Sequence, residues 1–346
     1  MNIVETRALT KTYGRKRAVS GMNLHVQRGD IYGFVGKNGA GKSTAMKMIA
    51  GLVQPTEGEI ILFGNAPATP CHPERSGAAA QPKDLRAPSS AFRASAKASA
   101  ETLAGASAAT SARIGALIEA PGLLPNLSAY ENLMVKALAQ GVVDAPARCR
   151  ETLSLVGLSA TGRKRVKGFS LGMKQRLGLA LALIGSPDLL LLDEPLNGLD
   201  PEATRSIRNL LVRLNQAFGI TIIISSHVLD QLDRVATRYG VIADGVLVRE
   251  LTAAQVQAEC SESLRVRTLR PETALVLLQE RFPQVTFRAL PDGALVLTGP
   301  FDAQAVSKAL HDADHTVVEF STMRRDLEEY FVELMDGGAK EGVRHV

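Results

Sequence analysis

The fold of this chain of 346 residues is decided by the stretch Gly36-Lys37-Asn38-Gly39-Ala40-Gly41-Lys42-Ser43-Thr44. An apolar run, residues 31–35, precedes this stretch, and an amphipathic segment, residues 44–52, follows it. Glycines at this spacing let the backbone wrap closely around an anion, so that successive N–H groups and the start of a helix face a phosphate. A strand, a glycine-rich loop and a helix in this order predict a phosphate-binding loop.

Two side chains of this loop carry chemistry. We expect the ammonium group of Lys42 to reach the terminal phosphoryl oxygens of a nucleotide, and the hydroxyl of Ser43 to hold Mg²⁺. The residues predicted to bind the nucleotide are Gly36, Lys37, Asn38, Gly39, Ala40, Gly41, Lys42, Ser43 and Thr44.

Two carboxylates follow a second apolar run. Residues 189–192 are consecutive leucines, a pattern typical of a parallel strand buried on both faces, and Asp193 and Glu194 come directly after them. Such an acidic pair is common on protein surfaces, but in a chain with a phosphate-binding loop it predicts catalysis. Asp193 would organise Mg²⁺ and its waters, and Glu194 would polarise an attacking water.

Three further motifs stand in order around these carboxylates. They are Phe169-Ser170-Leu171-Gly172-Met173-Lys174-Gln175-Arg176 before them, Asn197-Gly198-Leu199-Asp200 after them, and His227 at the end of the next predicted strand. With the phosphate-binding loop, this series resembles the ATP-binding cassette (ABC) ATPases over residues 1–250. The resemblance implies an α/β P-loop NTPase fold with a mostly parallel sheet, antiparallel β and helical subdomains, and ATP and Mg²⁺ as cofactors.

The resemblance also implies a dimer. In ABC ATPases two cassettes face head to tail, and the signature motif of one cassette, which corresponds to residues 169–176 here, completes the ATP site of the other. Ser170 and the N–H of Gly172 would therefore contact the γ-phosphate bound in the partner subunit. The resemblance also implies that Asp200 lies at the nucleotide. The chain would act as a homodimer or with a homologous cassette.

Within one chain, the same mapping assigns the remaining site residues. His227 would contact the γ-phosphate, and Tyr13 would stack on adenine, an interaction worth roughly 1 to 3 kcal/mol. The expected activity is ATP hydrolysis, with Lys42, Glu194 and His227 as the catalytic residues.

Three positions in two motifs depart from the commonest family pattern. The signature has Leu171 and Met173 where Gly and Gln are usual, while Ser170 and Gly172 are retained. In the lid loop, which lies within residues 114–122, Glu119 replaces the usual Gln. Its carboxylate would face Mg²⁺ or water, and it would bring a negative charge close to the γ-phosphate.

The lid-loop region also resembles one branch of the family. Residues 117–122, 125–128 and 131–133 look like the exporter ATPases that include bacitracin-resistance and lantibiotic-immunity transporters, and residues 326–331 are similar to the end of their accessory domain. This branch implies separate integral membrane permease subunits that dock beside residues 119–131. The chain would then be cytoplasmic, peripheral at the inner face of the membrane, and would couple ATP-driven dimer closure to export of a peptide antibiotic or similar drug.

Sequence patterns predict the domain organisation. Residues 1–250 form the ABC domain, with a low-complexity insert rich in Ala, Ser, Pro and Arg at 66–110 and a helical signature subdomain at 116–180. Residues 255–340 show a βαββαβ order, which predicts a small ferredoxin-like α+β domain. A charged helix at 323–335 would end the fold before a loose glycine tail.

Two local signals are specific enough to place single elements. Ser128 and Glu131 have the spacing of a capping box, which predicts a helix over Ala129–Ala139. Asp244-Gly245 lies between two apolar runs and predicts a hairpin turn.

Composition narrows the class of protein. Hydrophobic residues make up 45% and charged residues 22%, as in soluble globular proteins, and no stretch approaches the roughly 18 apolar residues of a membrane span. The N-terminus lacks the layout of a signal peptide. The net charge is +5, but the basic residues are scattered and only 4% of residues are aromatic, so we expect no nucleic-acid partner.

Two alternatives remain at this point. Soluble ABC ATPases of translation or DNA repair usually carry two cassettes or a long coiled-coil insertion, and neither pattern is present. A catalytically silent nucleotide-binding regulator would require Leu171, Met173 and Glu119 to prevent hydrolysis.

Overall fold

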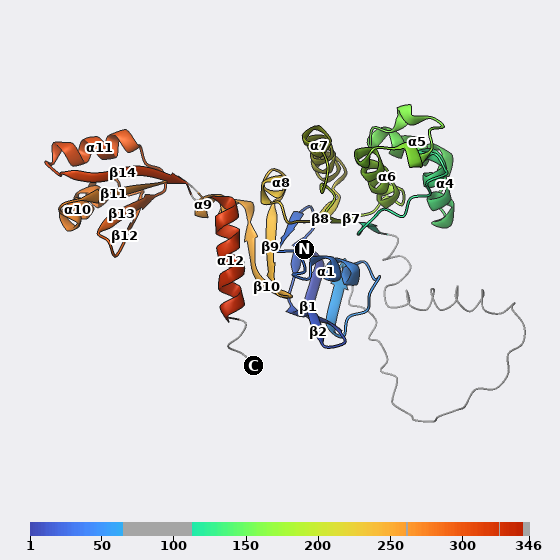
Figure 1. Ribbon diagram of the computed structural model, residues 1–346, viewed down its shortest axis with the longest axis horizontal. Coiled ribbons are helices and arrows are strands. Elements are labelled where there is room, and N and C mark those ends of the chain that lie inside the picture. Colours follow the sequence, from blue (N-terminus) through green and yellow to red (C-terminus); the bar gives the residue numbers. More distant parts are fainter. Residues whose placement is uncertain (65–112, 261, 325, 342–346) are drawn as a thin grey trace, which may run out of the picture. The chain divides into compact units, whose positions relative to one another are not determined.

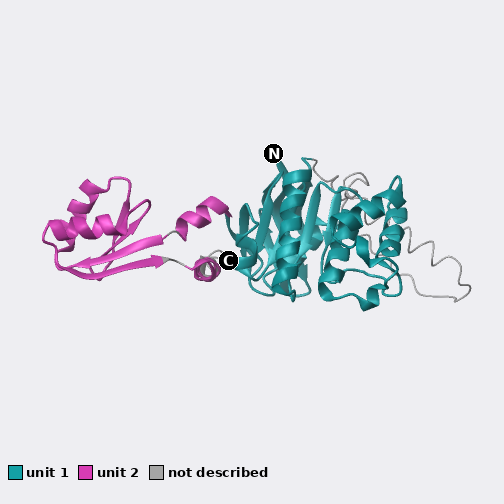
Figure 2. Cartoon of the chain, turned by 90° about the horizontal axis from the view of Figure 1, so that it is seen from above, with its two compact units in different colours: residues 1–250, 341–346 teal, residues 251–340 magenta. Residues whose placement is uncertain are grey.

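The computed structural model describes residues 1–64, 113–260, 262–324 and 326–341 (Figure 1). The predicted low-complexity insert at 66–110 lies outside the described residues. The chain divides into two compact units, Met1–Glu250 and Leu251–Lys340 (Figure 2).

A six-stranded sheet with the order β10-β9-β4-β8-β7-β6 forms the centre of unit 1. The pairs of β4 with β8 and β9, β7 with β8, and β6 with β7 are parallel. Every residue of β4, β7 and β8 is buried, as their apolar runs predict. Because these strands end at the same edge, the loops after them are neighbours. The strands are β4 (Ile31–Val35), β6 (Ile114–Leu117), β7 (Leu189–Asp193), β8 (Thr221–Ser226), β9 (Arg238–Ala243) and β10 (Val246–Thr252).

A second, antiparallel sheet packs on the first through helix α1 (Lys42–Ile49). One core cluster joins residues of β1, such as Leu9, to Met46 of α1 and Leu191 of β7. The helix that starts at the phosphate-binding loop is therefore held by apolar contacts with both sheets. The strands are β1 (Asn2–Tyr13), β2 (Lys16–Met22), β3 (His25–Gln27) and β5 (Glu57–Leu62), of which β2 is additional to the predicted elements.

Three helices form a separate group in unit 1. The predicted helix Ala129–Ala139 is confirmed as α4, and its capping box is present, because Ser128 N–H donates to Glu131 Oε2 (2.7 Å) while Glu131 N–H donates to Ser128 Oγ (3.3 Å). Gly115 lets β6 approach α6 closely, since a Cβ there would lie 2.2 Å from the Ala182 carbonyl oxygen. The group consists of α4, α5 (Ala145–Leu155) and α6 (Leu171–Leu183), with 3₁₀ turns η1 (Ser159–Thr161) and η2 (Val166–Gly168).

Two more helices accompany β8. Helix α7 (Pro201–Phe218) is capped by Asp200, packs against β8 and buries Thr204, Ile207, Leu211 and Leu214, which lie on one helical stripe. Helix α8 (Leu229–Asp233) follows β8. The predicted hairpin turn at Asp244-Gly245 is confirmed between β9 and β10.

Unit 2 begins with α9 (Ala253–Glu259) and then has the order β11-α10-β12-β13-α11-β14-α12. Its antiparallel sheet has the strand order β12-β13-β11-β14 and a core that includes Val266, Leu297 and Leu310. The elements are β11 (Glu262–Thr268), α10 (Pro271–Arg281), β12 (Thr286–Ala289), β13 (Ala294–Thr298), α11 (Ala303–Asp312), β14 (Val317–Arg324) and α12 (Leu327–Glu341).

The predicted last helix, 323–335, is wrong at both ends. Met323 belongs to β14, where it pairs with Ser263, because the ladder between β11 and β14 continues to Arg324. The helix starts at Leu327, after Asp326, whose carboxylate accepts the N–H of Glu328. It then continues through the two glycines to Glu341, since a glycine costs a helix only about 1 kcal/mol.

No helix among the described residues combines the length and the apolar character that crossing a bilayer requires.

Candidate functional site

The phosphate-binding loop leaves β4 and is shaped around glycines. Gly41 has φ +108°, and a Cβ on it would lie 2.5 Å from the carbonyl oxygen of Ala18. A Cβ on Gly36 would lie 2.5 Å from the carbonyl oxygen of Ile242. The hairpin between β9 and β10 holds the loop in place, because Gly245 N–H donates to the carbonyl of Ala40 (2.9 Å). Only glycine fits these positions, and the resulting cradle of backbone N–H groups fits a phosphate.

Lys42 lies buried at the start of α1. Its Nζ donates to the carbonyls of Gly36 (2.6 Å) and Lys37 (3.2 Å), and it lies 3.9 Å from Oε1 of Glu194. Burial lowers the pKa of Lys42, and the carboxylates of Glu194 and Asp193 offset part of that effect. The loop thus holds an ammonium group whose position is fixed by its own backbone.

Glu194 joins the phosphate-binding loop to the end of β8. Its Oε2 accepts a hydrogen bond from Nδ1 of His227 (2.7 Å), while its Oε1 faces Lys42. Its backbone has φ +50°, a left-handed conformation that is uncommon outside glycine and that turns the side chain out of the strand. The structure therefore brings together the three predicted catalytic residues, which come from the start of α1 and from the segments directly after β7 and β8.

Ser225 organises the two carboxylates, and it is a residue that the sequence motifs did not identify. The β7–β8 register places it opposite Asp193. Its hydroxyl donates to Asp193 Oδ1 (2.6 Å) and accepts the N–H of Glu194 (2.9 Å). Ser225 is fully buried. Its position two residues before His227 is the one sequence signal that points to it.

The oxygen donors near this site suit a hard cation. Asp193 is buried at the end of β7, and Ser43 is half-buried in the first turn of α1. Among the described residues there is no group of three or more acidic, histidine or cysteine side chains that could enclose a metal. Mg²⁺ needs no such cage, because it usually binds one or two protein oxygens and completes its shell with water and substrate phosphates. The residues present therefore fit MgATP.

Two predicted nucleotide contacts lie around this centre. Tyr13 is 49% exposed at the end of β1, with Nζ of Lys11 5.1 Å from its ring centroid. Glu119, in the loop after β6, forms an ion pair with Lys47 of α1. Both side chains are accessible to a ligand.

The predicted contacts to a partner nucleotide lie at two helix starts. Ser170 caps α6 by accepting the N–H of Met173 (3.3 Å), and Asp200 caps α7 by accepting the N–H of Ala203 (2.7 Å). Gly172 lies in the first turn of α6. Within the described parts of this chain, no hydrogen bond or ion pair joins these residues to Lys42.

Comparison with known proteins identifies this arrangement. The family model described as "ABC transporter" matches residues 19–197. The bacitracin transport ATP-binding protein BcrA of Bacillus licheniformis is 35% identical over 97% of this chain and 98% of its own length. The chain belongs to the ABC transporter ATP-binding family. The lantibiotic transport ATP-binding protein SrtF of Streptococcus pyogenes is 36% identical to this ABC cassette over 72% of the chain and 90% of its own length.

The solved structures agree with the family assignment. A dimeric, post-hydrolysis structure of the ATP-binding cassette MJ0796 with ADP and Pi has a TM-score of 0.57 and 25% identity, and the match covers 72% of this chain and 98% of that chain. The predicted ABC cassette fold and ABC-type ATPase class are confirmed, and the soluble translation or DNA repair alternative is not favoured.

One departure in the signature of this ABC cassette has a local explanation. Leu171 is half exposed, and its Cδ2 would lie 3.2 Å from a Cβ on Gly198, which has φ +72°. The larger side chain thus packs over the segment 197–200 of its own chain. The Gly172 backbone at the start of α6 remains available.

Proposed function

We propose that this chain is the ATP-hydrolysing subunit of an ABC exporter for a peptide antibiotic or a similar compound. The convergence of Lys42, Glu194 and His227 on one phosphate cradle carries the proposal. The transport roles named for BcrA and SrtF support the cargo class.

The protein groups divide the work of hydrolysis. Lys42 and the loop N–H groups hold the terminal phosphates, and Tyr13 stacks on adenine. Glu194 accepts a hydrogen bond from the attacking water, and His227, which is bonded to Glu194 Oε2, contacts the γ-phosphate. Ser43 and Asp193 would hold Mg²⁺, which when bound polarises the phosphoryl oxygens, and Glu119 from the lid loop would face the ion or its waters.

The active form is a head-to-tail homodimer, or a dimer with a homologous cassette. Ser170, the N–H of Gly172 and Asp200 lie at helix starts, where N–H groups favour an anion. They have no bond to Lys42 within the described chain, so a nucleotide bound in a partner subunit is their expected ligand. The dimeric form of the structurally similar cassette supports this arrangement.

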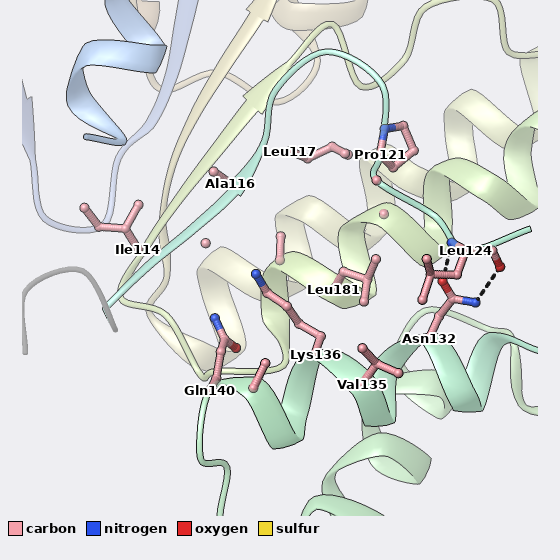
Figure 3. Close-up of a pocket in the computed structure, with 15 residues that line it drawn as sticks. Ile114, Ala116, Leu117, Pro121, Leu124, Asn132, Val135, Lys136, Gln140 and Leu181 are labelled. Atoms are coloured by element: carbon pink, nitrogen blue, oxygen red, sulfur yellow. Dashed lines mark hydrogen bonds between the residues drawn. The ribbon is translucent and has the colours of Figure 1, made fainter. Parts of the chain in front are cut away.

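Membrane permease subunits dock in a groove between β6, the segment that follows it, and helices α4 and α6. This docking keeps the chain at the inner face of the membrane. The groove encloses about 420 Å³ (Figure 3). Asn132 shapes its rim by donating to the carbonyl of Leu124 (3.1 Å) and accepting the Leu124 N–H (2.8 Å). Leu124 and Val135 leave apolar surface exposed, which suits the apolar face of a cytoplasmic permease helix. The other labelled side chains are Ile114, Ala116, Leu117, Pro121, Lys136, Gln140 and Leu181.

The proposed domains of the chain are the ABC cassette at 1–250, which includes a helical subdomain at 116–180, and a ferredoxin-like accessory domain at 255–340. The βαββαβ order and the strand order β12-β13-β11-β14 support the last assignment.

The experiment compares the wild-type chain with Glu194→Gln at saturating MgATP. The variant is expected to lose turnover and to accumulate as an ATP-bound dimer, measured by light scattering, because the amide still fills the site but cannot activate water. Lys42→Ala is the control that should bind no ATP and remain monomeric. Undiminished turnover of Glu194→Gln would refute the role of Glu194, and a variant that stays monomeric would refute the shared site.

A further inference from the structure

The ion pair between Lys47 and Glu119 joins the two segments that border the phosphate site. Lys47 belongs to α1, which starts at the phosphate-binding loop, and Glu119 belongs to the loop after β6. The side chain of Lys47 is 27% exposed and that of Glu119 is 66% exposed. The lysine stem is thus held against the protein, and the carboxylate comes to it from the loop.

Lys47 also lies on the functional face of α1. It follows Ser43 by four residues, so both side chains lie on the same side of the helix. The pKa of Lys47 is raised, first because Glu119 accepts its hydrogen bond and also because the negative charge of Glu119 lies beside it. The ammonium group of Lys47 therefore stays charged next to the lid-loop carboxylate.

The charges at positions 47 and 119 are matched. A carboxylate at position 119 alone would repel the phosphates of a bound nucleotide, and an ammonium group at position 47 alone would repel a divalent cation beside Asp193. As a pair, the two groups add no net charge to the site.

We infer that Lys47 is a positioning residue for Glu119, which holds the lid-loop carboxylate on α1 and neutralises it beside the MgATP site. This inference rests on the proposed function. Lys47 lies outside the family motifs, and its charge allows glutamate to stand where the family usually has glutamine.

The test is a double-mutant cycle on the full chain with Lys47→Met, Glu119→Gln and the double variant. For each protein we measure kcat, the KM for MgATP and the Mg²⁺ concentration that gives half-maximal turnover. Lys47→Met leaves an uncompensated carboxylate and should raise the KM about 2- to 5-fold, with a smaller change in kcat. Glu119→Gln leaves an uncompensated cation and should raise the required Mg²⁺ concentration by a similar factor. The double variant should return both values toward wild type, because the pair is neutral again.

Two further variants separate charge from packing. Lys47→Arg keeps the cation and should keep the wild-type KM, whereas a purely structural lysine would not be rescued in this way. Arg7→Met removes an exposed cation that pairs with Glu5 and Glu59 on the antiparallel sheet, and it should leave every value unchanged. If Lys47→Met does not fold, Lys47→Gln makes the same charge change with a polar side chain.

The inference would be overturned by additive effects in the double variant, or by a Lys47→Arg variant as impaired as Lys47→Met. Normal turnover of the wild-type chain would in that case leave the proposed function intact. A wild-type chain that neither binds nor hydrolyses MgATP would instead refute the proposed function.

Discussion

Replacing Ser225 with alanine tests whether a buried hydroxyl positions the catalytic carboxylates. The change removes the hydrogen bond to Asp193 (2.6 Å) and leaves the Glu194 N–H without its acceptor (2.9 Å), at a position with no exposed surface. A hydrogen bond to a charged group contributes about 1.5 to 3 kcal/mol, and an unsatisfied buried donor costs about 1 to 3 kcal/mol. The free energy of unfolding should therefore fall by about 2.5 to 6 kcal/mol.

The same variant should lose activity beyond its loss of stability. Groups that orient metal ligands typically affect activity or metal affinity about 10- to 100-fold, so kcat of Ser225→Ala should fall within that range. Steady-state ATP turnover at saturating MgATP, at a temperature where urea denaturation shows the variant to be folded, measures the effect.

Ser226→Ala is the matched control for this prediction. The Ser226 hydroxyl is also buried and makes two hydrogen bonds, donating to the Val228 carbonyl (3.2 Å) and accepting the Val228 N–H (3.0 Å), and within the described residues it has no hydrogen bond to a carboxylate. It should lose stability and keep turnover much closer to wild type. Wild-type turnover in Ser225→Ala, or an equal loss in Ser226→Ala, would refute the positioning argument.

Two more predictions concern the cradle and a helix cap. Gly41→Ala should weaken nucleotide binding by more than about tenfold in equilibrium titrations, because left-handed strain of about 1 to 2 kcal/mol adds to a contact of 2.5 Å with the Ala18 carbonyl. Gly39→Ala should have a smaller effect, because Gly39 has φ +83° but no atom lies within 4 Å of its Cβ position. Equal effects of the two substitutions would contradict this reasoning. The N–H and hydroxyl of Ser128 hold the pKa of Glu131 below its ordinary value of 4.5, so its ionised form stabilises the fold above that pH and the contribution disappears as the pH falls through the lower folded value. Glu131→Gln should therefore make the melting temperature less dependent on pH in the acidic range, and an unchanged dependence would count against the cap.

The sequence predicted most elements whose signals are local. The capping box at Ser128 acts across three residues, and the helix it starts has the predicted bounds. The consecutive leucines of β7 indicate burial on both faces, which the strand has. The predicted helix start at 323 is wrong because Met323 is held in β14 by pairing with Ser263 of β11, which lies 60 residues away along the chain.

Residue types and spacing alone therefore determined the phosphate-binding loop, the order of the motifs and the family, because a glycine cradle and its lysine lie within one short stretch of chain. Only the tertiary structure decided which side chains meet across that chain. The pairing of β7 with β8 places Ser225 on Asp193, and the loop after β6 brings Glu119 to Lys47. These contacts depend on strand register and on the path of loops, which long-range packing sets and which no local pattern encodes.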